Sequence, residues 1–109
     1  MKIEKLASLA KLETKEAFHT TAKAALKEVA DALELPKGSY EIRSNKAGPA
    51  ILGEVTLHGE NIYVQVGESP HGILYRTCKG RKDYTGGGNQ WLGWDRADRL
   101  VESIKRITR

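Results

Sequence analysis

The sequence is poor in the residues and segments that mark secreted or membrane proteins. It has 109 residues with a single cysteine and no long apolar run. Because Cys78 has no second cysteine, an internal disulfide is excluded, which fits a reducing compartment or a protein that needs no redox chemistry. Near the N-terminus, Glu4, Lys5 and Lys11 interrupt the apolar positions, so neither a signal peptide nor a membrane span is expected. These absences predict a cytoplasmic protein without a membrane partner.

Recognisable catalytic motifs are also missing. No spacing matches a nucleophile elbow, a metal site or a phosphate-binding loop. His19 lies in a predicted helix, whereas His58 and His71 lie in predicted turns, where histidines are usually solvated. A catalytic pair of Cys78 with a histidine would require the fold to join them by coincidence, so we interpret Cys78 as a buried or half-buried strand residue. We therefore expect no enzyme, no metal and no cofactor.

The composition is that of one globular domain with an uneven charge. Apolar residues make up 39% and charged residues 29%, which argues against disorder and for a single domain over residues 1–109. Residues 1–69 carry nine Lys/Arg and ten Asp/Glu, whereas residues 70–109 carry nine Lys/Arg and only four Asp/Glu. An anionic partner is therefore expected to meet the C-terminal third.

Helical periodicity is found at both ends of the chain. Apolar residues recur at three- and four-residue intervals over residues 14–33, which predicts one long helix with Thr14 as its N-cap and an end before Pro36. Residues 3–12 nearly continue this phase, as an extension of the helix or as a separate short one. A second amphipathic pattern predicts a helix from Asp95, as its N-cap, to the C-terminus.

Between the helices the apolar period changes to two, which predicts strands. The segments "SYEIRS" and "ILGEVTLHGENIYVQVG" alternate, and a type II′ turn at Gly59-Glu60 would set Leu57 opposite Ile62. The turn "SPHG" leads into "ILYRTCK" and would set Val64 opposite Thr77. The segment "WLGW" is either a short edge strand or a turn.

These elements predict an α+β fold. It is a two-layer sandwich in which a long N-terminal helix, a three- or four-stranded antiparallel meander and a C-terminal helix follow one another. One sheet face is apolar and is expected under the helices, while the other is polar and free for solvent or a partner. On that polar face the predicted rows are Glu54–Gln65–Arg76 and Thr56–Tyr63–Cys78. Lys46 and Pro49 would guard an edge strand, which favours a monomer.

The stretch "YRTCKGRKDYTGGGNQWLGW", residues 75–94, concentrates cations, aromatic rings and glycines. Cations can contact phosphates, and flat rings can stack on bases. The alternative is a solvated basic loop whose tryptophans only pin it to the core. Arginines of the C-terminal helix either extend the same positive surface or complement the helix dipole. The predicted binding residues are Tyr63, Arg76, Lys79, Arg81, Lys82, Tyr84, Asn89, Trp91 and Arg96.

Two resemblances bear on function. The order of one helix, a meander and a second helix is similar to that of the double-stranded-RNA-binding domain, but the second helix opens "DRADRL" and lacks that family's lysine-rich signature. Residues 72–92 resemble a stretch of small uncharacterised proteins of phages and prophages, which implies a phage setting without implying an activity. We expect a binding module for an anionic partner, with nucleic acid first and an acidic protein surface second. The alternative is a small phage-type regulator that inhibits a host protein.

Overall fold

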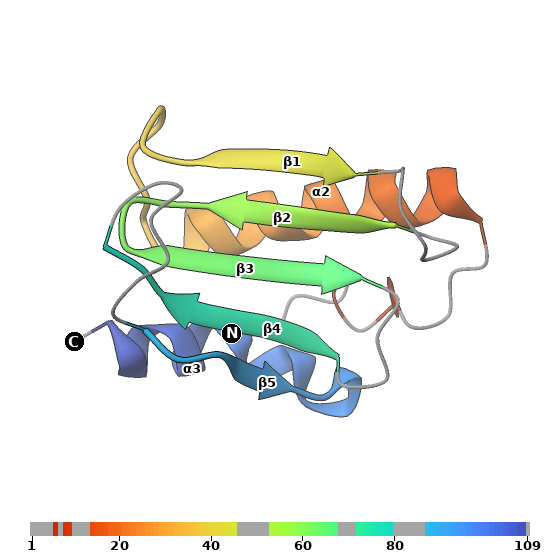
Figure 1. Ribbon diagram of the computed structural model, residues 1–109. Coiled ribbons are helices and arrows are strands. Elements are labelled where there is room, and N and C mark those ends of the chain that lie inside the picture. Colours follow the sequence, from red (N-terminus) through yellow and green to blue (C-terminus); the bar gives the residue numbers. More distant parts are fainter. Residues whose placement is uncertain are drawn as a thin grey trace.

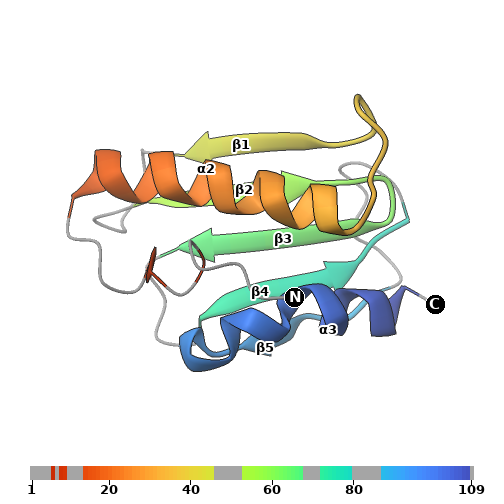
Figure 2. The ribbon, with the colours of Figure 1, turned by 180° about the vertical axis from the view of Figure 1, so that it is seen from behind.

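The computed structural model describes residues 6, 8–9, 14–45, 53–67, 72–79 and 87–108. Its elements in chain order are α2 (Lys15–Ala32), β1 (Glu41–Asn45), β2 (Glu54–His58), β3 (Ile62–Gly67), β4 (Ile73–Thr77), β5 (Gln90–Leu92), the 3-10 helix η2 (Trp94–Arg99) and α3 (Leu100–Ile107). The strands form one sheet in the order β1-β2-β3-β4-β5, and all neighbours are antiparallel. Both helices cover the same face of this sheet (Figures 1 and 2). The predicted α+β class is confirmed; the sheet has five strands rather than three or four because Gln90–Leu92 pairs with β4.

The long helix α2 has a side-chain cap at its N-terminus and a backbone capping motif at its C-terminus. The Thr14 side chain accepts a hydrogen bond from the Ala17 amide at 3.2 Å, so its predicted N-cap role is confirmed. Thr14 itself is extended, so α2 begins at Lys15. Most of residues 3–12, for which an extension or a separate helix was predicted, lie outside the described residues. At the other end the Leu35 amide donates to Ala30 O and the Glu34 amide donates to Asp31 O, which is a Schellman motif. Glu34 takes the left-handed conformation that this motif needs, with φ of 57°.

The hairpin registers differ from the predicted ones by two residues. Leu57 lies opposite Val64 rather than Ile62, and Val64 lies opposite Tyr75 rather than Thr77. In the hairpin of β2 and β3 the reason is the turn, in which the Gly59 amide donates to Ile62 O at 2.9 Å and leaves Glu60 and Asn61 at the tip. The tip is therefore one residue further along the chain than the predicted Gly59-Glu60 turn. A shift by an even number leaves every side chain on its predicted face.

The core lies between the helices and one sheet face. Leu57, Val64 and Ile73 are fully buried there. They share one core with the alanine-rich side of α2, where Ala22 and Ala25 are also fully buried. The helix α2 packs on β1 and β2, whereas α3 packs on β4. The other buried core residues are Leu6, Leu9, Phe18, Leu26, Val29, Ala30, Val55, Ile62, Val66, Tyr75, Leu92, Ala97, Leu100, Val101 and Ile104.

The C-terminal helix does not begin as predicted. Gly93 rather than Asp95 is the N-cap of η2, and no side chain caps this end. The first turns are a 3-10 helix with non-helical backbone at Arg96 (φ −116°, ψ 17°), and the α-helix begins only at Leu100. The 3-10 spacing places Ala97 and Leu100 on one side, and both are buried. The start of the C-terminal helix is therefore fixed by the packing of Ala97 and Leu100 and not by the predicted Asp95 cap.

Some predictions concern other parts of the chain. The proposed edge guards Lys46 and Pro49, and the turn histidine His71, lie outside the described residues. In the described ranges, no helix has the length and hydropathy that crossing a bilayer requires.

Candidate nucleic-acid interface

The sheet face turned away from the helices, called the open face below, is arranged in two cross-strand rows. The pairing of the strands fixes both rows and corrects the rows predicted from the sequence, since Tyr63 now lies opposite Arg76. The first row is Glu41, His58, Tyr63 and Arg76; the second is Arg43, Thr56, Gln65, Leu74 and Trp91. Neither helix packs on this face (Figures 1 and 2).

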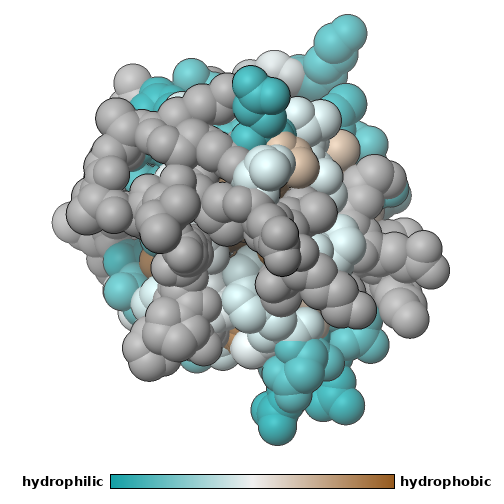
Figure 3. Space-filling view, turned by 90° about the vertical axis from the view of Figure 1, so that its right-hand side faces the viewer, coloured by the Kyte–Doolittle hydropathy of each residue, from teal (hydrophilic) through white to brown (hydrophobic). Residues whose placement is uncertain are grey.

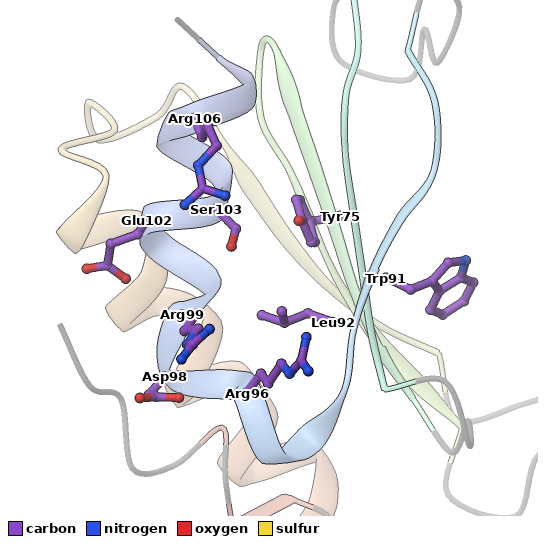
Figure 4. A pocket seen from close by; sticks show the side chains of 9 residues that line it. All are labelled: Tyr75, Trp91, Leu92, Arg96, Asp98, Arg99, Glu102, Ser103 and Arg106. Carbon is purple, nitrogen blue, oxygen red and sulfur yellow. The ribbon is translucent and has the colours of Figure 1, made fainter.

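Trp91 stands at one end of the open face. It is 47% exposed, and in the described part of the chain it is the only exposed large hydrophobic side chain. It lies opposite Leu74 on the edge strand β5, and its indole points away from the helix layer (Figure 4). A flat apolar ring is thus presented to solvent beside a second apolar side chain.

Arg76 is held in place next to this ring by neutral acceptors. Its guanidinium donates to Asn89 Oδ1 at 3.0 Å, to Gly87 O at 2.8 Å and to Thr77 O at 3.2 Å. Gly87 is required here, because a Cβ atom at this position would overlap Thr77 O. These acceptors orient the guanidinium. Asn89, which we predicted to contact a partner, positions Arg76.

Tyr63 is the half-buried centre of a polar cluster on the same face. Its hydroxyl donates to Gln65 Oε1 at 2.8 Å, and its ring meets the edge of the His58 ring with centroids 5.2 Å apart. His58 in turn shares a hydrogen bond of 2.8 Å with the Thr56 hydroxyl. The prediction of a solvated turn histidine at position 58 is wrong, since His58 is buried at the end of β2. Cys78 is buried as predicted, with its thiol near Gly59 O.

Of the other predicted site residues, the structure describes Lys79 and Arg96. Lys79 is exposed just beyond the end of β4. Arg81, Lys82 and Tyr84 lie outside the described residues. Arg96 belongs to a different surface on the helix side of β5. Of the nine predicted residues, the open face therefore brings together Tyr63, Arg76, Asn89 and Trp91.

That second surface is a groove of about 640 Å³ between β5 and the C-terminal helix, called the arginine groove below. Figure 4 shows Leu92 and Tyr75 pointing from the sheet toward the helix, and Arg96 reaching toward β5. Hydrophilic residues gather at the lower end of the side view, where β5 and η2 lie (Figure 3). The lining residues are Tyr75, Trp91, Leu92, Arg96, Asp98, Arg99, Glu102, Ser103 and Arg106.

Helix geometry explains how the cations gather in the groove. Arg99, Ser103 and Arg106 are spaced by four and three residues and so lie on one side of the helix. Asp98 and Glu102 are shown on the side of the helix away from β5 (Figure 4). Between described residues, salt bridges join Lys27 with Asp31 and Arg43 with Glu41, and none involves the groove arginines. The arginines of this helix were predicted as a possible positive surface, whereas Tyr75 and Ser103 were not predicted as site residues because their place in the groove depends on the fold.

Neither surface resembles a metal centre. Within the described ranges, no three His, Cys, Asp or Glu side chains are grouped to hold a metal ion. Comparison of the chain with protein-family models, with curated proteins and with solved structures found no match.

Proposed function

We propose that this protein binds single-stranded nucleic acid on its open face. Trp91 and Tyr63 serve as stacking platforms for bases, and Arg76 contacts a phosphate. The observation that carries the proposal is the exposed indole of Trp91, which stands on the sheet face that neither helix covers, the face that also carries Arg76. Exposed aromatic rings on a sheet are a common platform for unpaired bases.

Two further features support this choice of partner. The C-terminal third carries most of the excess positive charge, which favours a polyanion. The open face is broad and antiparallel, and it offers no helix for a duplex major groove. Bases must therefore be unstacked to reach Trp91, so a single strand fits better than a duplex.

The test is a titration of fluorescent oligonucleotides of about 12 nucleotides, followed by anisotropy at low and at physiological salt. We expect binding that weakens as salt rises, because counterions are released from phosphates. Trp91→Ala is expected to weaken binding roughly 5- to 150-fold, the range that corresponds to the stacking energy of one base. Trp91→Phe keeps a stacking surface and should retain most of the affinity.

Controls separate stacking from charge and from folding. Arg76→Gln is compared with Lys27→Gln, which removes a cation from the exposed outer surface of α2, 65% exposed at its side chain. Only Arg76→Gln should weaken oligonucleotide binding and reduce the slope of log affinity against log salt. Absence of binding at low salt, or equal affinities of Trp91→Ala and the unmodified protein, would overturn the proposal. Capture of a protein partner without oligonucleotide affinity would favour the regulator hypothesis instead.

A further inference from the structure

We infer that the arginine groove is a phosphate-binding site that takes the backbone of the nucleic-acid strand whose bases stack on the open face. This inference rests on the proposed function. It adds a path for the ligand: the strand crosses the edge of the sheet at β5 and continues between β5 and α3. Arg96, Arg99 and Arg106 are the residues assigned to the phosphates.

The edge strand connects the two surfaces. β5 has three residues, and it pairs with β4 at the end of the sheet order. Neighbouring residues on a strand point to opposite faces, so Trp91 is on the open face while Leu92 points toward α3. Trp91 also borders the groove. A ligand that stacks on the indole is therefore only the thickness of one strand from the arginines.

The charge of the groove selects an anion. Its three arginines form no salt bridge with a described carboxylate, and Arg96, Arg99 and Arg106 are all exposed. Two acidic residues, Asp98 and Glu102, also line the groove, so its three arginines give the lining a net positive charge of one. A guanidinium offers a planar set of donors that matches phosphate oxygens. Ser103 adds a hydroxyl on the side of the helix that carries Arg99 and Arg106.

The shape and lining of the groove argue for a polymer backbone rather than a small ligand. Pockets for small molecules are mainly apolar and enclose the ligand. Here five of the nine lining residues are charged, and the groove runs along an exposed sheet edge. A chain of phosphates can follow such a groove, with one guanidinium at each successive contact.

The experiment compares oligonucleotides of two lengths, of about three and about 12 nucleotides, on the unmodified protein and on the triple variant Arg96→Gln/Arg99→Gln/Arg106→Gln. The short oligonucleotide covers the Trp91 platform, so its affinity should be nearly the same on both proteins. The long one should bind the triple variant at least tenfold more weakly at physiological salt. The slope of log affinity against log salt should fall by about two, since each lost single-strand phosphate contact removes about 0.7.

A matched variant controls for net charge. Lys23→Gln/Lys27→Gln/Lys37→Gln removes the same charge from exposed positions in and just after α2, and it should leave the length-dependent gain in affinity unchanged. The variant Arg96→Lys/Arg99→Lys/Arg106→Lys keeps the charge and should keep most of the salt slope. It also provides the test if the glutamine variant does not fold.

The outcomes distinguish the two proposals. Both oligonucleotides could bind with an affinity that depends on Trp91, while the triple glutamine variant binds the long one as tightly as the unmodified protein does. In that case the groove inference is wrong and the open-face function stands. If neither oligonucleotide binds at low salt, the proposed function fails and the inference fails with it. Binding of inorganic phosphate to the groove arginines without binding of the long oligonucleotide would also overturn the inference, since it would show a site for a free anion.

Discussion

The two faces of the single sheet differ in burial and in chemistry. On the helix-covered face Val55, Leu57, Val64 and Val66 are all fully buried. One residue away along the same strands, the open face carries hydroxyl, imidazole, amide and guanidinium groups, with exposed Trp91 at the edge. The same backbone thus supports a dry core on one side and a polar, aromatic surface on the other.

The rigidity of the open face comes from both sides of the sheet. Buried apolar residues on the covered face fix the strands, and hydrogen bonds on the open face fix the side chains. Arg76 and Tyr63 each donate to a neutral partner, so neither must be ordered when a ligand arrives. Preorganised contacts lose less entropy on binding, which is an advantage for a small surface.

The largest effect is expected from truncating the covered face. Leu57→Ala should lower the free energy of unfolding by about 2 to 5 kcal/mol, because it leaves a cavity among fully buried residues. The matched open-face variant is Arg43→Ala, whose exposed pairing with Glu41 should contribute roughly 0 to 1 kcal/mol. Urea unfolding followed by circular dichroism measures both. Similar losses in the two variants would contradict the division between the faces.

The sequence predicts this division well, because the two faces follow from alternation alone. Val55, Leu57, Val64 and Val66 alternate with polar residues, and the strand period sends them to one side. The same period does not determine the register, because a shift by two residues leaves every side chain on the same face of the sheet. The apolar pattern therefore could not distinguish a turn at Gly59-Glu60 from one at Glu60-Asn61.

Other features of the site depend on tertiary contacts. No local sequence pattern shows that His58 is buried against Thr56 and Tyr63. None shows that Asn89 accepts a hydrogen bond from the Arg76 guanidinium. The arginine groove needs the position of α3 relative to β5, and the 3-10 entry at Trp94–Arg99 sets that position. Asp95 resembles an N-cap in sequence, but burial of Ala97 and Leu100 determines how the helix begins.

A smaller effect is expected from the junction that anchors β5, the strand shared by both surfaces. Gly72 has φ of 89°, and a Cβ atom there would overlap the Leu92 carbonyl oxygen. Gly72→Ala should therefore cost about 1 to 3 kcal/mol and also weaken oligonucleotide binding through displacement of Trp91. Gly88→Ala is the control, because a Cβ at that position meets nothing within 4 Å. Equal stability of the two variants in thermal unfolding would show that Gly72 does not fix β5.

The smallest predicted effect has the opposite sign and concerns the helix over the covered face. Glu34 ends α2 in the left-handed region, which costs a residue with a Cβ about 1 to 2 kcal/mol. Glu34→Gly removes this strain but adds conformational entropy to the unfolded chain, worth about 0.5 to 1 kcal/mol, so a net stabilisation of up to about 1.5 kcal/mol is expected. Lys23→Gly, in the middle of the same helix, should instead destabilise by about 1 kcal/mol.

Urea unfolding of both variants tests the signs, and destabilisation by Glu34→Gly would show that the Schellman end does not limit the stability of α2. Oligonucleotide affinity should stay constant in both, because α2 packs on the face opposite Trp91.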